Sequence, residues 1–313
     1  MKLNKPKFWD KKYSFLAFFL LPVTLLIIII IFIKKKITKS IKFNIPVICI
    51  GNIYVGGTGK TPTSIYIAKQ LSKMGKNPAI LKKFYQEHID EHNLIRDSFK
   101  NLILNKNRVE GILEAEKMSH DIIILDDGFQ DYKIKKDLSI ICFNQNQLIG
   151  NGLIMPSGPL RESLSNLKNA NIILINGKKN IQFEEKIFKI NDKLKIFYTS
   201  YRPINIDKFK GKRLLALAGI GNPSNFFELL EENNLTIKKK LIYPDHYEFS
   251  KSEILDIVKK AQDDNCQIIT TEKDYFKINN FQNNNIEYIK VALEIDEKDK
   301  LFKIITKLYD QNI

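Results

Sequence analysis

The pattern of apolar and polar residues changes near residue 41. Before that point a single apolar run, residues 14–33, lies between two groups of lysines. Beyond it, short apolar runs rich in β-branched residues alternate with segments whose apolar residues recur at helical spacing. Buried strands that alternate with amphipathic helices and glycine turns are typical of a parallel α/β sheet. The pattern therefore predicts an apolar N-terminal segment joined to an α/β protein.

The α/β part is predicted element by element from these runs. Strands are expected at residues 46–50, 79–81, 101–104, 121–125, 138–143, 171–175, 214–217 and 267–270. Helices are expected at residues 61–74, 109–118, 223–230 and 254–261. The alternation pauses around residues 197–212, where lysine, aspartate, asparagine and proline gather as they do in linkers. We therefore expect a membrane anchor (1–40), a core (41–203) and a smaller C-terminal α/β domain (204–313).

The apolar run has the length of a membrane helix, which needs about 20 apolar residues to cross a bilayer core. A cleaved signal peptide is disfavoured, because Lys34, Lys35 and Lys36 stand where a small-residue cleavage site belongs. A transmembrane helix and an interfacial or hairpin anchor both stay open, since Pro22 can bend the helix and lysines flank both ends. Lysines after the run favour the cytoplasmic side. The prediction is an N-terminal membrane helix on the cytoplasmic membrane, with the α/β part facing the cytoplasm.

Composition narrows the class of protein. Of the 313 residues, 44% are hydrophobic and 27% are charged, so the chain can bury a core and is not of the disordered kind. Three scattered cysteines form neither a disulfide framework nor a metal-binding spacing, which fits a reducing compartment. The net charge of +15 comes almost entirely from lysines spread along the chain. A nucleic-acid partner is therefore not expected, whereas anionic lipid is compatible with this charge.

The strongest local motif is a glycine-rich loop between an expected strand and an expected helix. Its residues are Val55, Gly56, Gly57, Thr58, Gly59, Lys60, Thr61 and Pro62. Glycines let backbone N–H groups turn around phosphate oxygens, and in such loops the lysine reaches the β- and γ-phosphates while the threonine binds Mg²⁺. Tyr54 replaces the first glycine of the common pattern, so the loop resembles the deviant loops of some P-loop ATPases. The motif predicts a P-loop NTPase-like core that binds nucleotide; the alternative is a structural turn.

A pair of acidic residues follows another apolar run further along the chain. Asp126 and Asp127 come directly after the strand expected at residues 121–125. This arrangement places a carboxylate beside the Mg²⁺ of a nucleotide held by the phosphate loop. An acidic turn is the alternative, because Asp-Asp-Gly is good turn chemistry. Together with the loop, the acids predict a metal site that includes Thr61, Asp126 and Asp127.

Several segments, in a fixed order, resemble the tetraacyldisaccharide 4′-kinases. They are Ile-Cys-Ile-Gly-Asn (48–52), the phosphate loop (55–62), Asp-Asp-Gly-Phe-Gln (126–130), Pro-Ser-Gly-Pro-Leu-Arg-Glu (156–162), Ala-Gly-Ile-Gly-Asn-Pro (218–223) with Phe226 and Phe227, Pro-Asp-His-Tyr (244–247) and Thr-Glu-Lys-Asp (271–274). They span almost the whole chain, and their order is far more specific than any one of them.

The resemblance implies a kinase that uses ATP and Mg²⁺. Its acceptor would be the 4′-hydroxyl of a tetraacylated glucosamine disaccharide 1-phosphate, in lipid A biosynthesis. The partners expected are this acylated lipid and the cytoplasmic face of the inner membrane, with no obligate protein partner. The resemblance also implies a membrane-facing P-loop core and a smaller C-terminal domain that closes over the nucleotide.

The resemblance assigns roles to particular residues. In this family an aspartate assisted by a histidine takes the proton of the sugar hydroxyl, which by position points to Asp90 and His246 beside Lys60. Arg161 suits a phosphate contact, and Glu162 suits support of the metal. Two further assignments carry alternatives. Arg108 contacts phosphate or forms a salt bridge on a helix face, and residues 271–274 contact nucleotide or cap a helix.

One segment departs from the family pattern. After the second strand the family carries Ser-Arg-Gly-Tyr and a long loop that ends in Gly-Asp-Glu-Pro. Residues 81–92 of this chain read Leu-Lys-Lys-Phe-Tyr-Gln-Glu-His-Ile-Asp-Glu-His, so the loop is short and its Arg and Gly are absent. The assignment of Asp90 comes from aligning residues 90–91 with the Asp-Glu of the family.

Two other functions are compatible with parts of the sequence. A membrane-associated P-loop ATPase or GTPase that drives a partner protein would use the same glycine-rich loop, but it has no ready use for the segments at 156–162 and 244–247. A basic, membrane-tethered binding module with a degenerate loop would account for Tyr54. Lipid-dependent ATP consumption separates the first from a kinase, and Mg-ATP binding separates the second.

Overall fold

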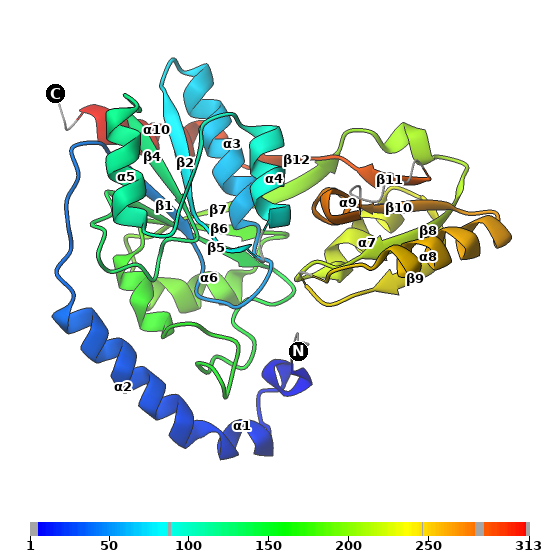
Figure 1. Ribbon diagram of the computed structural model, residues 1–313. Helices are drawn as coiled ribbons and strands as arrows, with labels where there is room; N and C mark the ends of the chain where they lie inside the picture. Colours follow the sequence, from blue (N-terminus) through cyan, green and yellow to red (C-terminus); the bar gives the residue numbers. More distant parts are fainter. Residues whose placement is uncertain (1–5, 87–88, 246, 279–284, 311–313) are drawn as a thin grey trace. The chain divides into compact units, whose positions relative to one another are not determined.

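The computed structural model of the protein describes residues 6–86, 89–245, 247–278 and 285–310, except for the side chains of Asp90, Tyr309 and Asp310. The chain divides into two units (Figure 1). The larger unit comprises Lys5–Phe84, Phe99–Ser200 and Ile295–Ile313, and the smaller unit includes Tyr85–Ser98 and Tyr201–Glu294.

A parallel sheet forms the centre of the larger unit. Its strand order is β12-β7-β6-β5-β1-β4-β2-β3, and every pairing from β7 to β3 is parallel. The strands are β1 (Val47–Gly51), β2 (Pro78–Lys83), β3 (Leu102–Asn105), β4 (Ile122–Asp126), β5 (Leu138–Asn144), β6 (Ile172–Asn176), β7 (Lys195–Pro203) and β12 (Val291–Ile295). The last three residues of β7 and all of β12 except Ile295 are counted with the smaller unit. All residues of β1, β4, β5 and β6 are buried, as expected for strands covered on both faces. The carboxyl ends of these parallel strands share one edge of the sheet, where ligands bind in such folds.

Helices follow the strands of this unit. They are α3 (Lys60–Lys73), α5 (Arg108–Lys117), α6 (Ile181–Phe188) and the C-terminal α10 (Lys298–Asp310). Helix α10 buries Leu301 and Ile305 completely, on the apolar face that its helical spacing creates. The ring of Phe302 lies 6.3 Å from the ring of Tyr66 in α3, measured between centroids. The end of the chain therefore packs beside the helix that starts at the phosphate loop.

The smaller unit has a second parallel sheet, in the order β11-β10-β8-β9. Its strands are β8 (Arg213–Ala218), β9 (Thr236–Ile242), β10 (Gln267–Thr271) and β11 (Ile286–Ile289), and its helices are α4 (Ile89–Ser98), α7 (Pro223–Glu232), α8 (Lys251–Asp263) and α9 (Glu272–Ile278). Two apolar clusters fill it. One joins α7 to the sheet through Phe226, Phe227 and Leu230, and the other joins α8 through Ile254 and Val258.

The expected strands and helices are all present, with bounds that differ by a few residues. Two segments, however, do not belong to the unit in which the predicted domain boundaries place them. Helix α4 is part of the smaller unit, and Ile295–Ile313 return to the larger one. The backbone N–H of Asp296 donates to the carbonyl of Tyr198 at 2.9 Å, which joins the returning chain to β7. A prediction that cuts the sequence into consecutive domains cannot describe a chain that goes back to its first domain.

The apolar N-terminal run does not form a single spanning helix, one of the two forms that the sequence leaves open. It is divided into α1 (Phe15–Phe19) and α2 (Leu21–Ile37), with Leu20 between them. Pro22 lies in the first turn of α2, and proline favours the start of a helix because it has no N–H to donate to a preceding turn. Within the described ranges of the chain, no helix combines the length and the apolar character needed to cross a membrane.

Helices α1 and α2 expose most of their apolar side chains. Thr24 is the buried residue of α2. Its hydroxyl contacts the Ser157 hydroxyl at 2.8 Å and the carbonyl of Ile154 at 3.3 Å. At the carboxyl end, Lys35 donates to the Asn166 side chain at 2.9 Å. The large apolar residues that stay exposed are Phe15, Leu16, Phe18, Phe19, Val23, Leu25, Leu26, Ile28, Ile29, Ile30, Phe32, Ile33 and Ile37. We call them the α1–α2 apolar surface.

The cysteines provide a test of the core packing. Burial raises the pKa of the Cys49 and Cys142 thiols to about 12 each, whereas Cys266 is only half-buried. A thiol whose pKa lies that far above the pH of the solution stays protonated and is a poor nucleophile. With a chromogenic disulfide reagent at pH 8, we expect the native protein to release about one equivalent of chromophore rapidly and unfolded protein about three. Rapid release of three equivalents by native protein would contradict this packing.

Candidate active site

The glycine-rich loop joins β1 to α3 at the carboxyl edge of the larger sheet. Gly56 and Gly59 have positive φ angles of 113° and 86°, a backbone region that other residues rarely adopt. Thr58 is buried, and its hydroxyl accepts a hydrogen bond from the Asn52 amide at 3.0 Å. The same amide lies 3.4 Å from the carbonyl of Gly56. Asn52 therefore holds the loop in shape from inside, and Lys60 begins α3, where the helix N-terminus favours an anion.

Asp126 ends β4 and is surrounded by donors. It is fully buried. Its Oδ2 accepts hydrogen bonds from the Thr61 hydroxyl at 2.9 Å and from the Lys82 ammonium at 2.5 Å, and its Oδ1 accepts one from the Ser64 hydroxyl at 3.0 Å. Both hydroxyls come from the first turns of α3, so the helix that carries the loop also binds the acid. The sequence prediction that Thr61 and Asp126 lie together is confirmed.

Asp127, the next residue, faces the cations of the loop. Its φ of 61° is left-handed, which turns the chain sharply after β4. One Nη of Arg161 contacts both carboxylate oxygens of Asp127, at 2.9 and 3.0 Å, and the Lys60 ammonium lies 3.6 Å away. Burial opposes ionisation of Asp127, but Lys60 and Arg161, with a smaller contribution from Lys82, outweigh it and hold the pKa of Asp127 well below its usual range. Asp127 is therefore a carboxylate at neutral pH.

These residues fit a Mg²⁺ ion that arrives with phosphate. Mg²⁺ prefers oxygen ligands and is held by one or two carboxylates together with substrate phosphates, not by an all-protein cage. Thr61, Asp126 and Asp127 supply a hydroxyl and two carboxylates beside the phosphate loop. Among the residues that the structure describes, no group of three or more acidic, histidine or cysteine side chains is arranged to hold a metal. A hydroxyl and two carboxylates are the kind of donors that hold Mg²⁺ together with a bound phosphate.

Glu162 does not join this cluster through any contact that the structure records for it. It is buried, accepts a hydrogen bond from the Tyr132 hydroxyl at 2.7 Å, and is also bonded to the Asn166 amide. Burial raises the pKa of Glu162, although both hydrogen bonds act in the opposite direction. Its role as a metal ligand stays a prediction. Arg161, its neighbour, is bound to Asp127, so the phosphate contact predicted for this arginine also stays a prediction.

Arg108 contributes to the shape of the acidic turn. Its Nη2 donates to the backbone carbonyl of Asp127 at 2.7 Å, and its Nη1 lies 3.4 Å from Asp131. Its Nε is buried and has no hydrogen-bond partner among the described residues. Arg108 thus forms a salt bridge, but with a residue of the turn after β4 and not on the face of its own helix, and it also contacts a backbone carbonyl. Sequence reasoning gave Asn52 no role of its own, although it ends the motif at residues 48–52. It missed Ser64 and Lys82, because single polar residues outside a motif carry no positional signal.

The smaller unit holds the other predicted catalytic segments. His246 and the side chain of Asp90 lie outside the described residues, so both catalytic roles stay predictions. Their neighbours are described. Lys273 contacts Glu91 at 3.1 Å and Asp245 at 3.0 Å, and thereby joins the residue after Asp90 to the residue before His246.

The Thr-Glu-Lys-Asp segment caps a helix. The Thr271 hydroxyl accepts from the backbone N–H of Asp274 at 3.1 Å and donates to its carboxylate at 2.8 Å. Asp274 is fully buried and also accepts from the backbone N–H of Gly219 at 2.8 Å. The alternative interpretation of this segment, a helix N-cap, is confirmed for α9. A contact with nucleotide stays a prediction.

The sequence of these segments is decisive when it is compared with known proteins. Residues 16–310 match the family described as tetraacyldisaccharide-1-P 4′-kinase. The chain belongs to this family.

Individual relatives agree with the family assignment. A tetraacyldisaccharide 4′-kinase of Pelagibacter ubique is 43% identical, with all of both chains covered. One from Rickettsia felis is 32% identical and covers 98% of each chain. Among solved structures, LpxK from Aquifex aeolicus in complex with ATP superimposes with a TM-score of 0.71 at 26% identity, covering 93% of this chain and 99% of that one. The match confirms the α/β fold with its mostly parallel sheets, and the family model confirms the resemblance drawn from the motifs.

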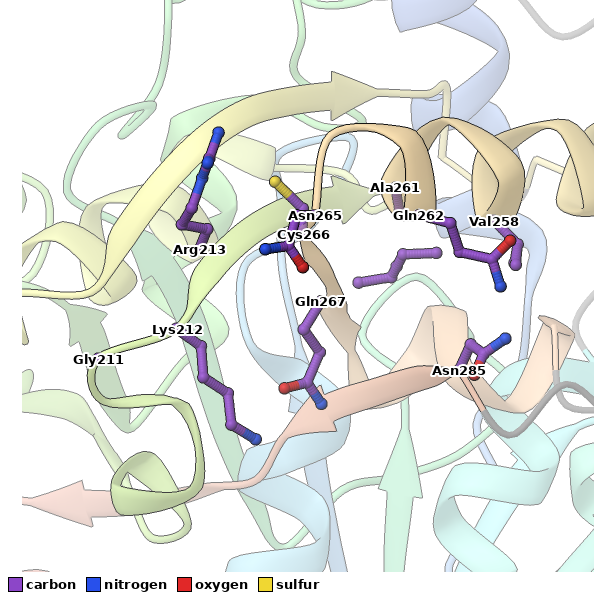
Figure 2. A pocket seen from close by; sticks show the side chains of 11 residues that line it. Gly211, Lys212, Arg213, Val258, Ala261, Gln262, Asn265, Cys266, Gln267 and Asn285 are labelled. Atoms are coloured by element: carbon purple, nitrogen blue, oxygen red, sulfur yellow. The ribbon is translucent and has the colours of Figure 1, made fainter.

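A separate cavity of about 550 Å³ lies in the smaller unit of this family member (Figure 2). Arg213 and Gln267, which line it, are the first residues of β8 and β10. Val258 and Ala261 of α8 supply apolar contacts. The cavity therefore lies at the amino ends of the strands, opposite the edge where ligands bind in parallel sheets. It holds none of the residues in the motifs.

Proposed function

We propose that the protein transfers the γ-phosphate of ATP to the 4′-hydroxyl of a tetraacylated glucosamine disaccharide 1-phosphate, the kinase step of lipid A biosynthesis. One observation carries the proposal. Lys60, Thr61, Asp126, Asp127 and Arg161 converge at one edge of the sheet, in a chain that matches this kinase family from residue 16 to residue 310. The ATP in the related Aquifex aeolicus structure supports ATP as the donor.

The larger unit supplies the charges that phosphoryl transfer needs. Catalysis of this reaction depends on positioning and on neutralising charge on the phosphate oxygens. Lys60 would bind the terminal phosphates from the start of α3, and Asp127 holds Lys60 and Arg161 on the same side of the loop. Thr61 and Asp126 would hold Mg²⁺, which supplies positive charge at the phosphates when it is bound. Because Asp127 stays ionised at low pH, it keeps this arrangement over the whole physiological range.

The acceptor side is supported by two features of the larger unit. The α1–α2 apolar surface is compatible with acyl chains or with the outer layer of a membrane. A cavity of about 270 Å³ next to it is lined by Lys35, Lys135 and Lys136 together with Tyr132 and Glu162. Lysines beside an apolar surface suit a lipid that carries phosphate. We therefore propose that the protein works at the cytoplasmic surface of the inner membrane, with no obligate protein partner.

The proton of the sugar hydroxyl needs an acceptor. A positioned carboxylate or histidine contributes about 10²–10⁴-fold to such reactions. We assign the acceptor to Asp90, assisted by His246, on the motif positions alone. Lys273 links the neighbours of both residues, so it is a positioning residue for the pair.

Replacing Lys273 with methionine tests this link. The change removes the charge that Glu91 and Asp245 share and leaves two acids with their common cation gone. We expect kcat to fall by about 10–100-fold, because small displacements of reacting groups are costly, while the affinity for ATP changes less than about twofold. Lys259→Met, at an exposed position of α8, is the matched control and keeps the wild-type kcat. A rise of KM for ATP with kcat unchanged would contradict the positioning role.

The function is tested by incubating purified protein, in detergent, with γ-labelled Mg-ATP and the acylated disaccharide 1-phosphate. We expect label on the lipid, and none with the Lys60→Ala variant. Hydrolysis of ATP without transfer to lipid would instead favour an ATPase that drives a partner protein. Neither transfer nor hydrolysis by folded protein would favour a binding module with a degenerate loop.

A further inference from the structure

Lys82 is a buried cation that binds Asp126, next to the phosphate loop. Its side chain is 6% exposed and that of Asp126 0%, with 2.5 Å between the ammonium and Oδ2. Buried lysines are rare unless they are paired. Lys82 of β2 and Asp126 of β4 are partners in the register of adjacent parallel strands, so both side chains leave the same face of the sheet. The sheet itself therefore fixes this pair.

The ammonium of Lys82 binds the carboxylate that would hold a metal. Oδ2 of Asp126 accepts from Lys82 and also from the Thr61 hydroxyl at 2.9 Å. Lys82 is therefore within two hydrogen bonds of Thr61, the hydroxyl that suits Mg²⁺. A divalent cation placed between Thr61 and Asp126 would meet a positive charge in a site with little water, where like charges repel strongly.

We propose that Lys82 is a further functional residue of this site: it neutralises Asp126 in the nucleotide-free enzyme, so that a divalent cation enters together with a nucleotide and not before it. When a triphosphate is present, the ammonium of Lys82 donates its hydrogen bonds to the phosphate oxygens. The Asp126 carboxylate is then available to the metal. Lys82 is then a second phosphate-binding lysine beside Lys60.

The charges around the site support this exchange. Lys60, Lys82 and Arg161 bring three positive charges against two negative charges from Asp126 and Asp127. A metal alone would add to this excess of positive charge, whereas a metal with a triphosphate adds net negative charge. Charge-assisted hydrogen bonds to phosphate oxygens are strong enough to compete with the carboxylate for the ammonium. The proposal rests on nucleotide binding at this loop, which is part of the proposed function.

Two binding measurements on Lys82→Met test the proposal, with Mn²⁺ as the probe. Free Mn²⁺ is counted by electron paramagnetic resonance, first without nucleotide. We expect the variant to bind Mn²⁺ at least ~10-fold more tightly than wild type, because the repelling charge next to the carboxylate is gone. With adenylyl imidodiphosphate and Mn²⁺, we expect the variant to bind the nucleotide ~10-fold more weakly, because one phosphate contact is lost. Lys69→Met, exposed on α3, is the control and matches wild type in both measurements.

A second variant is measured in case Lys82→Met does not fold. Lys82→Gln places an uncharged amide, one bond shorter than the lysine side chain, beside Asp126. The same two results are expected for it, and circular dichroism confirms that each variant is folded. An unchanged affinity in either measurement, for a folded variant, overturns the proposal. Failure of the wild-type protein to bind the Mn²⁺–nucleotide complex would overturn the proposed function instead, so the two results are distinguishable.

Discussion

Replacing Lys60 with alanine is expected to reduce phosphate transfer by about 10³-fold, equivalent to about 4 kcal/mol of transition-state stabilisation. Lys60 is the first residue of α3, its side chain is 14% exposed, and its ammonium faces Asp127 at 3.6 Å. A cation at this position stabilises the negative charge that develops on the transferred phosphate. The measurement is transfer of labelled phosphate to the lipid acceptor under single-turnover conditions.

The fold should survive this change. Asp127 keeps Arg161 at 2.9 Å, and a partly exposed ion pair of 3.6 Å contributes only about 0–1 kcal/mol to the free energy of unfolding. Lys69→Ala, on an exposed part of the same helix, is the matched control and should transfer phosphate at the wild-type rate. Lys60→Ala protein with wild-type turnover, purified free of host enzyme, would refute the nucleotide assignment.

Hydrophobic periodicity predicted the apolar strands of both sheets, including the edge strand β3, but it did not predict β7, β9, β11 and β12. Strands such as β4 and β5 are continuous apolar runs and are buried throughout, so the pattern and the burial coincide. Strand β9 reads Thr-Ile-Lys-Lys-Lys-Leu-Ile and lies at the edge of the smaller sheet, with most of its residues exposed. Charged residues are common on edge strands because they discourage further pairing. Such a strand has no apolar run from which to be predicted.

The apolar N-terminal run shows the opposite failure. Its hydropathy predicted a membrane segment, either one spanning helix or an interfacial or hairpin anchor bent at Pro22, but hydropathy does not encode where a helix starts and stops. Pro22 places a new start in the middle of the run, and Thr24 binds Ser157 far along the chain. The result is two helices with an exposed apolar surface and, among the described residues, no helix that could cross a membrane.

The candidate site was predictable where residues form a motif and not where the sheet brings them together. Lys60, Thr61, Asp126 and Asp127 belong to two motifs whose spacing on adjacent strands is common to many nucleotide-binding proteins. Lys82 is one lysine among many and becomes visible only through the register of β2 with β4. The sequence segment around it had stood out for what it lacks, the Arg and Gly of the family pattern, and not for the cation that it supplies.

The loss of the predicted base should be almost as severe as the loss of Lys60. We expect Asp90→Asn to lower kcat by about 10²–10⁴-fold, because a sugar hydroxyl is a weak nucleophile until its proton has an acceptor. The affinity for ATP should change little, since the phosphate loop and its acids are all in the larger unit, whereas Asp90 lies in α4 of the smaller one. The measurements are kcat with saturating lipid and the affinity for a non-hydrolysable ATP analogue.

The surroundings of Asp90 make this test specific. Glu91, the next residue of α4, is held by Lys273, so a change at position 90 leaves the contact that orders this part of the helix in place. Asp97→Asn, at an exposed position of the same helix, removes one carboxylate without touching that contact, and its kcat should equal that of wild type. If Asp90→Asn kept the wild-type kcat, residues 90–91 would not correspond to the Asp-Glu of the family. Transfer would then depend on another acid of the short segment, among which Glu91 is the first to replace because Lys273 already positions it.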